Sequence, residues 1–223
     1  MQRVVVNSNN KEHNFKNETK TVELETLEAY SVLQLFQKRV VDYVMVLILL
    51  VVTWPIILYS IYRIKKESPG SILFKQQRVG LNGKTFTCYK FRSMHSDSHF
   101  NPYTQDNDSR IFPYGHIMRR MRIDELAQVL NVLKGDMHIV GPRAEWNILV
   151  DEYRKSISNY DQRHKVRPGI TGLAQVKYPY GRNLYDAKKK FVYDSIYIRN
   201  WSIILEIKIL FQTVFVVLKR SGV

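Results

Sequence analysis

The feature that most constrains this chain is a run of twenty residues without a charged side chain, Tyr43 to Tyr62. A helix of about 20 apolar residues is long enough to cross the hydrocarbon core of a bilayer. The run is not a secretory signal, because it begins some forty residues into the chain and no small-residue cleavage pattern follows it. We therefore expect the segment to stay in the mature protein and to hold it at a membrane.

The flanks and a proline favour a re-entrant hairpin over a single span. Lys38 and Arg39 precede the run, and Arg63 and Lys65 follow it, so both ends carry the cations that are typical of cytoplasmic loops. Pro55 lies inside the run, where it lacks an N–H group and should bend the helix. A bent helix could enter and leave the membrane by the same face. A single span and a buried helix of a soluble protein remain the alternatives.

Outside this segment the pattern predicts an α+β fold, mainly helical, with a small β-hairpin. Two extended stretches, residues 72–79 and 84–91, flank an Asn-Gly pair at 82–83, and Asn-Gly between apolar runs is a strong hairpin signal. Apolar residues recur at helical spacing over residues 123–133 and stop at Gly135, which predicts one amphipathic helix with a glycine end.

The tail from Trp201 to Leu218 is strongly apolar but is interrupted by Glu206, Lys208 and Gln212. These polar residues favour an interfacial or core-packed helix rather than a second span. Residues 1–20 are polar and are expected to be disordered, and the serines, aspartates and prolines between Ser96 and Pro113 predict a loop.

Composition says that some partner is anionic. The chain has 34 Lys and Arg against 20 Asp and Glu, a formal net charge of +14. Nucleic acid, lipid headgroups or a phosphorylated substrate would each fit this charge. The single cysteine, Cys88, excludes a disulfide framework and a zinc site built on several thiolates. The histidines are scattered without ligand spacing, and we interpret them as structural or surface residues.

Asp124 and Glu125 are the strongest candidates for chemistry. They open the predicted helix, shortly after Arg119, and Arg143 follows the next apolar step. A carboxylate can serve as a nucleophile or a metal ligand while its neighbour orients or accepts a proton. The planar guanidinium of arginine suits phosphate recognition. The alternative is that acids in a first helical turn only offset the helix dipole, and that the arginines form a solvated basic surface.

Several motifs together resemble the bacterial polyprenyl-phosphate sugar-1-phosphate transferases, the monotopic phosphoglycosyl transferases. The resemblance covers the chain from about residue 38 to the end. The chain looks like the short form of this family, without the four-helix membrane bundle of the long form. The motifs, in chain order, are KRVVDYV, the proline-bent apolar segment, QQRVG, YKFRSM, RIDELAQVLNVLKGDMHIVGPR, HKVRPGITGLAQV and LKRSGV.

The resemblance implies a two-step reaction on the cytoplasmic face of the bacterial inner membrane. A carboxylate would attack a UDP-sugar, release UMP and carry the phosphosugar, which undecaprenyl phosphate would then take to start a surface glycan. It further implies a polar, partly disordered extension at 1–36, a re-entrant membrane helix at 37–66 and a catalytic domain at 67–223, anchored also by interfacial amphipathic helices. Inner-membrane lipids would be partners, and downstream glycosyltransferases are possible ones.

The same resemblance assigns roles to residues. Asp124 would be the nucleophile and would hold Mg²⁺, with Glu125 as its catalytic neighbour and Pro55 as the membrane bend. A metal and nearby cations are needed because a carboxylate is repelled by an anionic diphosphate. The substrate-binding candidates are Arg119, Pro142, Arg143, Lys90 and Arg92. We expect a UDP-N-acetylhexosamine in preference to UDP-glucose or UDP-galactose.

Some positions depart from the family pattern. Trp54-Pro55 stands where Ser-Pro is common, Ala127 and Ala144 replace prolines, and the stretch from Lys177 to Asn183 is longer than usual. The two alanines remove no charged or nucleophilic group. Trp54 offers no serine hydroxyl to bond the carbonyl that the proline frees, and the longer stretch reflects either a changed nucleotide-sugar pocket or only a longer loop.

Two hypotheses from other classes compete with the enzyme. A chain of this charge with helix-turn-helix-like spacing around residues 123–146 could bind nucleic acid at a membrane. The acid pair argues against it, because without a metal it would repel phosphates, and we expect no nucleic-acid partner. A non-catalytic membrane scaffold would make the intact motifs a coincidence.

Overall fold

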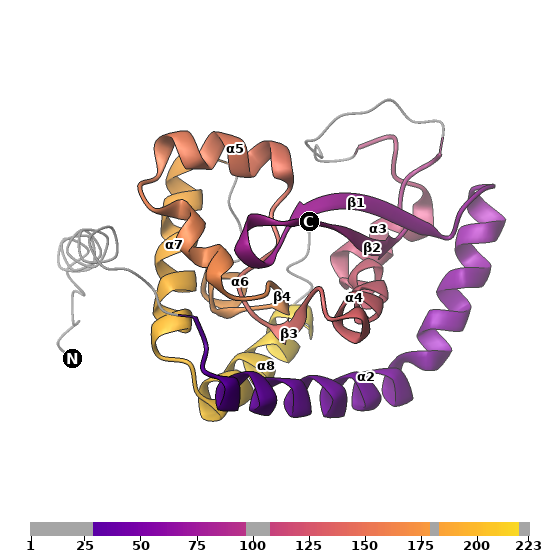
Figure 1. Ribbon diagram of the computed structural model, residues 1–223. Coiled ribbons are helices and arrows are strands. Elements are labelled where there is room, and N and C mark those ends of the chain that lie inside the picture. Colours follow the sequence, from indigo (N-terminus) through magenta and orange to yellow (C-terminus); the bar gives the residue numbers. More distant parts are fainter. Residues whose placement is uncertain (1–28, 97–107, 179–182, 219–223) are drawn as a thin grey trace, which may run out of the picture.

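The computed structural model describes residues 29–96, 108–178 and 183–218. Most of the predicted N-terminal extension, most of the predicted loop between Ser96 and Pro113, and four residues of the stretch from Lys177 to Asn183 lie outside these ranges. The described part is mostly helical and carries two small two-stranded sheets, which agrees with the predicted α+β class. Figure 1 shows the helices α5 (Asn147–Ser156) and α7 (Leu184–Arg199) on the left, and the hairpin of β1 (Leu73–Val79) and β2 (Thr85–Phe91) across the upper part. The long α2 (Val32–Glu67) lies beneath, with α8 (Ile203–Leu218) just above it.

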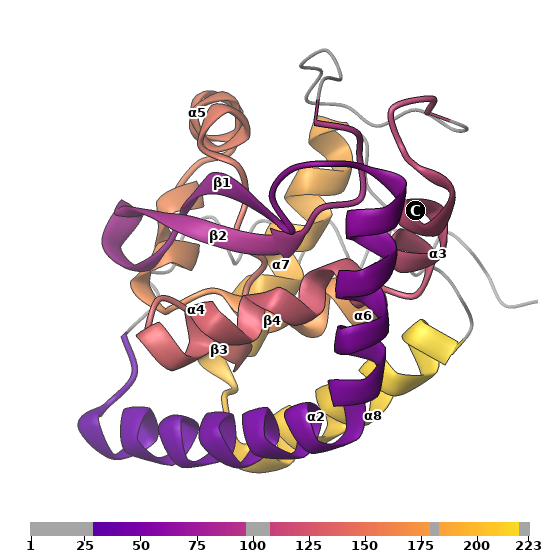
Figure 2. The same cartoon turned by 90° about the vertical axis from the view of Figure 1, so that its right-hand side faces the viewer.

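The apolar run forms helix α2, Val32–Glu67. Ser31 and Gln34 close a reciprocal cap at its start, with hydrogen bonds of 2.8 and 3.3 Å. Part-way along, the helix bends, and its second half turns upward along the side of the domain (Figures 1 and 2). Pro55 lies in this helix. Thr53 adds to the bend, because its hydroxyl donates to the carbonyl oxygen of Leu49 at 2.6 Å.

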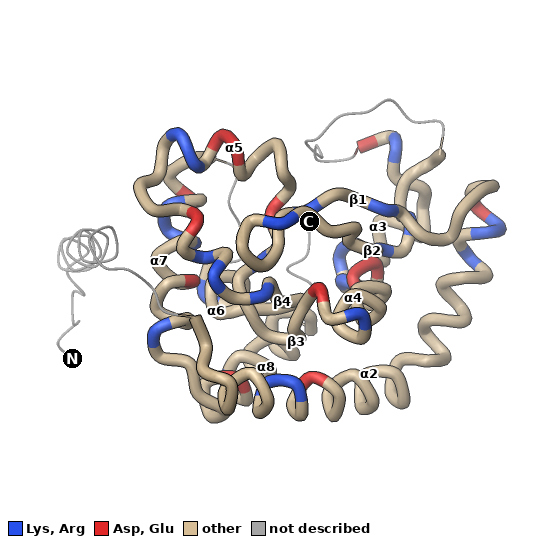
Figure 3. Tube along the Cα trace, viewed as in Figure 1, with Lys and Arg blue, Asp and Glu red and all other residues tan. Residues whose placement is uncertain are grey.

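Among the described residues α2 is the one helix that is long and apolar enough to cross a membrane. Its middle carries no charge, as the uninterrupted tan stretch of Figure 3 shows. Only 11% of its most apolar window is buried, which is far less than a core helix of a soluble protein would bury. The structure therefore disfavours the buried soluble helix.

The predicted hairpin is confirmed. Strands β1, Leu73–Val79, and β2, Thr85–Phe91, pair antiparallel around the short 3₁₀ turn η1, Leu81–Gly83. Asn82 and Gly83 both have positive φ, 54° and 73°, which explains why Asn-Gly stands here. A second pair was not predicted from the sequence: β3, His138–Val140, runs parallel to β4, Gly169–Thr171.

The prediction of one helix over residues 123–134 is wrong in two respects. The segment is a 3₁₀ helix, η2 (Ile123–Gln128), followed by the α-helix α4 (Val129–Lys134), which ends at Gly135 as predicted. The predicted faces are also not kept in the second half, where the polar Asn131 is fully buried while Leu130 and Leu133 are 43% and 47% exposed. In the first half Ile123 and Ala127 are buried as predicted. Tertiary contacts decide this orientation, since β2 packs against η2 and draws the polar side inward.

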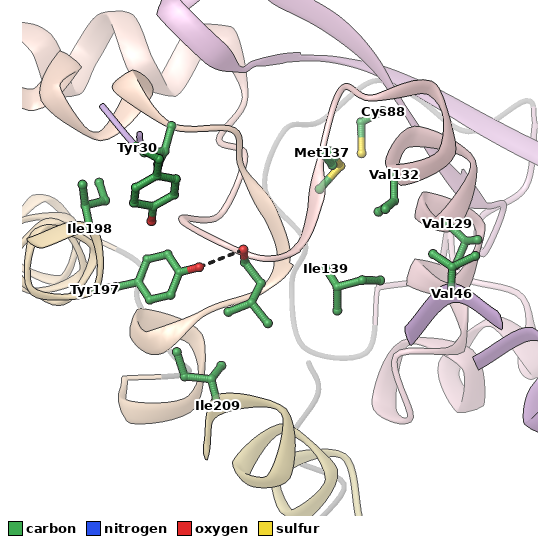
Figure 4. Packing of buried hydrophobic residues seen from close by; sticks show 12 residues of the cluster. Tyr30, Val46, Cys88, Val129, Val132, Met137, Ile139, Tyr197, Ile198 and Ile209 are labelled. Atoms are coloured by element: carbon green, nitrogen blue, oxygen red, sulfur yellow. Dashed lines mark hydrogen bonds between the residues drawn. The ribbon is translucent and has the colours of Figure 1, made fainter. Parts of the chain in front are cut away.

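The remaining helices complete the domain. Helix α8 follows the predicted apolar tail, and it buries Glu206 and Ile209 while most of its other side chains face outward. A central core joins α2, α4, β3, α7 and α8, and Figure 4 shows Tyr197, Ile139, Val132 and Ile209 within it. The remaining elements are α3 (Pro113–Arg120), η3 (Tyr160–Lys165) and α6 (Leu173–Lys177).

Candidate active site

The acid pair lies in the first turn of η2. Asp124 and Glu125 are buried, with 9% and 7% of their surface exposed. The turn that leads into them passes through Arg122, whose φ of 55° is in the left-handed region. This reversal ends α3 and starts η2, so both carboxylates are brought under β2 instead of facing solvent as acids in a first helical turn usually do.

Three cations surround Glu125. The ammonium of Lys90 on β2 lies 3.0 Å from its Oε1, and a guanidinium nitrogen of Arg143 lies 3.4 Å from the same oxygen. Arg122 approaches Oε2 at 3.6 Å. Burial would raise the pKa of Glu125, but the charges of Lys90, Arg143 and Arg122 outweigh it and hold the pKa well below its usual range. Glu125 is therefore a permanent carboxylate that gathers cations.

Asp124 is in a different environment. Burial raises the pKa of Asp124, with the neighbouring charge of Glu125 acting in the same direction and the charges of Lys90 and Arg119 opposing both. No hydrogen bond or ion pair of this carboxylate is present in the described part of the chain. Adjacent carboxylates in such different surroundings can take different roles. Glu125 organises the cations, while Asp124 is available to a ligand.

A cavity of about 290 Å³ opens in front of the pair. It brings together five of the residues that the sequence put forward, namely Asp124, Glu125, Lys90, Arg119 and Arg143. Together with Arg122 they place four cations beside two acids. This arrangement suits an anionic group such as a diphosphate, and the dipole-only interpretation of the acids does not account for it.

Arg92 and Pro142 do not line this cavity. The guanidinium of Arg92 instead donates to the Ser68 hydroxyl at 2.8 Å, the Ser68 carbonyl at 2.6 Å and the Pro69 carbonyl at 2.9 Å. It ties the end of α2 to the strand that carries Lys90. Pro142 accepts a hydrogen bond from the backbone N–H of Gly169 at 2.9 Å, next to Arg143. Both residues therefore hold the site in place from outside.

The sequence missed much of the far wall of the cavity. This wall comes from α5, η3 and α7, for which no functional residue was predicted. Arg163 on η3 is fixed there by Asp194 on α7, with N–O distances of 2.6 and 3.0 Å. Arg163 immediately precedes the motif HKVRPG, and this position was the one signal in the sequence that could have indicated a functional residue in this wall. The residues of this wall are Glu145, Leu149, Tyr153, Tyr160, Arg163, Asn183, Ala187, Lys190, Phe191 and Asp194.

Residues for a cation site are few. Among the described residues no group of three or more His, Cys, Asp or Glu side chains could hold a metal. Within the acid pair Glu125 is occupied by cations, so Asp124 is the member left to bind a metal ion. Mg²⁺ commonly binds through one or two carboxylates together with substrate phosphates. One carboxylate beside cations that suit phosphates fits the ligands that a Mg²⁺ ion bound together with a substrate would use.

The structure does not contain the helix-turn-helix that the nucleic-acid hypothesis placed at residues 123–146. Residues 138–140 form a strand, and no helix follows α4 before α5, so there is no helix-turn-helix at 123–146. The arginines of this region lie around a cavity together with acids, whereas nucleic-acid binding requires an open basic surface.

Comparison with known proteins decides the family. A model of the bacterial sugar transferase family matches residues 33–220, which is most of the chain. The chain belongs to the bacterial sugar transferase family. The matched range includes the acid pair, the strands β1 to β4 and nearly all of α2.

Individual relatives agree with this membership. The chain is 42% identical over 189 residues to a UDP-N-acetylgalactosamine-undecaprenyl-phosphate N-acetylgalactosaminephosphotransferase of Aeromonas hydrophila, covering 84% of this chain and 45% of that protein. It is 43% identical to a UDP-glucose:undecaprenyl-phosphate glucose-1-phosphate transferase of Xanthomonas campestris, covering 82% and 39%. It is 41% identical to the uncharacterized sugar transferase EpsL of Bacillus subtilis, covering 83% and 89%. The chain thus spans less than half the length of the first two relatives.

Proposed function

We propose that this sugar transferase moves a sugar 1-phosphate from a UDP-sugar to undecaprenyl phosphate and so starts the synthesis of a surface glycan. The observation that carries the proposal is a buried Asp-Glu pair beside Lys90, Arg119, Arg122 and Arg143 in one cavity, in a domain that also carries a long apolar helix. The names of the Aeromonas and Xanthomonas relatives describe the same transfer with two different sugars.

The reaction has two displacements at one phosphorus. In the first, a carboxylate oxygen of Asp124 bonds to the phosphorus that bears the sugar, and the bond from that phosphorus to UMP breaks. In the second, an oxygen of undecaprenyl phosphate attacks the same phosphorus, and the bond to Asp124 breaks to restore the carboxylate. Each step exchanges one P–O bond for another, so no proton or further reactant is needed.

The cations offset the charge repulsion in both steps. Lys90, Arg119, Arg122 and Arg143 line the cavity and can neutralise charge on the phosphate oxygens as it develops. Glu125 holds Lys90 and Arg143 through its Oε1, so its role is to position cations and not to attack. Asp124, which has no such partner in the described part of the chain, is the nucleophile.

Mg²⁺ belongs to the proposal as the partner of the diphosphate. When bound, Mg²⁺ would neutralise phosphate charge and favour the ionised form of the carboxylate that holds it. Asp124 would hold it, together with the substrate phosphates.

The membrane helix fits a re-entrant arrangement. Near its start, the Lys38 ammonium donates to the carbonyl oxygen of Val140 at 3.0 Å. Near its end, the Ser60 and Tyr114 hydroxyls are 2.9 Å apart, and Glu67 accepts from the backbone N–H of Tyr114 at 2.7 Å. Both ends of α2 are thus bonded to one domain, so the helix can enter and leave by the same face. We place this domain on the cytoplasmic face of the bacterial inner membrane.

Other exposed apolar side chains support the same placement. Leu130 and Leu133 on α4, and Ile204, Phe211 and Phe215 on α8, are exposed, as is most of α2. Exposed apolar area of this extent marks a membrane or protein contact. We therefore propose that α8 lies in the interface, with inner-membrane lipids as neighbours and later glycosyltransferases of the pathway as users of the product. Among sugars we propose a UDP-N-acetylhexosamine.

The test is UMP release by the detergent-solubilised protein with Mg²⁺, undecaprenyl phosphate and four UDP-sugars: UDP-GlcNAc, UDP-GalNAc, UDP-glucose and UDP-galactose. We expect activity with at least one sugar and a loss of about 1000-fold or more in Asp124→Asn, because the nucleophile is gone. Asp151→Asn on α5, an exposed acid outside the cavity, serves as the control and should keep wild-type activity. Full activity in Asp124→Asn would contradict the covalent mechanism.

A further inference from the structure

The cavity continues well beyond the acid pair. From Asp124 it extends toward α5 and η3, where Tyr153 and Tyr160 form its wall, and along α7, where Lys190 and Phe191 do. In both views α5 lies on the side of the domain opposite α2 (Figures 1 and 2). The far end therefore lies away from the membrane helix, and the reaction as proposed so far gives it no role.

Two charged residues at this far end, Glu145 and Lys190, make no close side-chain contact within the described part of the chain. In the described ranges, neither the Glu145 carboxylate nor the Lys190 ammonium makes a hydrogen bond or an ion pair within 4.0 Å. By contrast, Arg163 in the same wall is fixed by Asp194. Burial would raise the pKa of Glu145, but the charges of Arg143 and Arg163 outweigh it and lower the pKa. Glu145 is thus a carboxylate that is ready to accept hydrogen bonds from a ligand.

An aromatic wall lies beside these charges. Tyr153 and Tyr160 meet edge to face with ring centroids 5.4 Å apart, and Tyr160 and Phe191 are tilted with centroids 5.6 Å apart. Tyr160 and Phe191 are almost fully buried, so the wall is rigid. Aromatic faces beside a few convergent polar groups are typical of a small-molecule subsite. A pyranose ring matches this lining, since its C–H faces are apolar and its rim consists of hydroxyl or amide groups.

The geometry of the two displacements indicates which part of the substrate lies at the far end of the cavity. In phosphoryl transfer the entering and leaving oxygens are roughly in line through phosphorus. UMP leaves opposite Asp124 in the first step, and the lipid phosphate attacks from that same position in the second. The lipid reaches this position from the membrane, so the nucleotide binds on the side that is open to the bilayer. The sugar, which stays on the phosphorus through both steps, must point elsewhere.

We propose, on the basis of the function proposed above, that the far end of the cavity binds the sugar ring of the nucleotide sugar and that Glu145 and Lys190 determine which sugar is accepted. Glu145 accepts hydrogen bonds from sugar hydroxyl or amide groups, and Lys190 donates to sugar oxygens. A site built to hydrogen-bond a substrate group rejects analogues that lack or misplace it, because its own polar groups are then left unpaired.

The experiment compares Glu145→Gln and Lys190→Met with the wild type on the same four UDP-sugars. Two quantities are measured: the ratio of kcat/KM between the best and the next-best sugar, and the inhibition constant of UMP. Matched controls are Glu152→Gln on α5 and Lys188→Met on α7, which lie outside the cavity. We expect each cavity variant to change the sugar ratio at least tenfold and the UMP constant less than twofold, while both controls leave both quantities unchanged.

The outcomes separate the two proposals. Sugar ratios that stay within twofold in both cavity variants, with the wild type active, overturn the sugar assignment alone. A UMP constant that weakens in parallel with kcat/KM for every sugar also overturns it, since the far end would then hold the nucleoside. A wild type that releases no UMP from any of the four sugars, under conditions where a relative is active, counts against the proposed function and the sugar assignment together.

Discussion

At the scale of single residues, buried polar side chains do most to hold the site together. Asn131 on α4 is fully buried, and its side chain accepts from the backbone N–H of Tyr89 at 2.9 Å. It also donates to the carbonyl oxygen of Thr87 at 2.7 Å and to Asp136 at 3.1 Å. Through these bonds it fixes strand β2, which carries Lys90, against the segment that carries the acid pair.

Asn131→Ala should therefore lower the free energy of unfolding by about 2–4 kcal/mol, because it leaves the backbone groups of β2 without their partners. Thermal unfolding in detergent measures this change. Asn200→Ala is the matched control, since the Asn200 side chain also donates to a backbone carbonyl, at 2.9 Å, but is exposed. An equal effect of the two substitutions would show that Asn131 does not hold β2.

His164 predicts a dependence of stability on pH. Its Nδ1 lies 2.9 Å from Asp161, and burial together with the charge of Arg163 lowers the pKa of His164 from 6.5 to about 4. Because the folded-state pKa is depressed, the stabilisation is complete above pH 6.5 and is lost as the pH falls toward 4. Between pH 7 and pH 5 the loss is about 2 kcal/mol.

Thermal unfolding at pH 7 and pH 5 tests this expectation. His164→Asn keeps a hydrogen-bond donor but cannot titrate, so its stability should fall less than that of the wild type over this interval. A remaining slope is expected from His138, which is also buried and whose pKa burial lowers as well. The same slope in wild type and variant would contradict the assignment to His164.

At the scale of elements, the bend of α2 decides how the chain meets the membrane. Pro55 has no N–H group to donate to the carbonyl oxygen of Val51, so one backbone hydrogen bond is missing. In addition, the Thr53 hydroxyl donates to the carbonyl oxygen of Leu49. Trp54 stands where a serine commonly precedes this proline in the family, yet the helix still bends. The exposed Trp54 beside it has no hydrogen bond in the described part of the chain.

Pro55→Ala should straighten α2 and move its N-terminal end across the membrane, because the missing N–H is restored and the steric clash is removed. A cysteine introduced at Ser31, which is exposed, reports the location of that end. In intact cells a membrane-impermeant maleimide should leave it unlabelled in the Pro55 background and label most of it in Pro55→Ala. Trp54→Ala should behave like the parent, and an unlabelled Pro55→Ala would contradict this role of the proline.

At the scale of the whole molecule, one buried ion pair connects the membrane helix to the rest. Lys38 on α2 and Glu206 on α8 pair with about 1% of either side chain exposed. Lys38 also donates to the Tyr197 hydroxyl at 2.9 Å, and Trp201 donates to Glu206 at 2.8 Å. Figure 4 shows Tyr197 bonded back into the core, at 3.0 Å from the carbonyl oxygen of Val140.

Lys38→Met should destabilise the protein by about 3–5 kcal/mol, because it leaves Glu206 as an unpaired buried charge. The double variant Lys38→Met with Glu206→Leu should recover much of this loss, since both charges are then gone. Unfolding of the single and double variants in detergent gives the coupling energy. Lys208→Met, on the exposed face of α8, should have little effect. Additive losses in the double variant would show that the two residues do not act as a pair.

Several features follow from the sequence because they depend on local physics. The length and polarity of residues 43–62 predict a membrane helix, Pro55 predicts its bend, and Asn82-Gly83 predicts the hairpin turn. Gly135 predicts the end of α4, where a φ of 88° is needed. Each of these depends on groups within a few residues of one another, so the pattern alone is sufficient.

The tertiary structure decided the rest, because it depends on groups far apart in the chain. Residues 123–134 have an amphipathic pattern, but packing against β2 buried the polar Asn131 and left Leu130 and Leu133 exposed. Arg92 stands in a basic motif like Lys90, yet only Lys90 reaches the cavity, because β2 ends at Phe91 and Arg92 is bonded to the end of α2 through Ser68 and Pro69. The far wall, with Glu145 and Lys190, forms only when α5 and α7 come together, and no local pattern contains that contact.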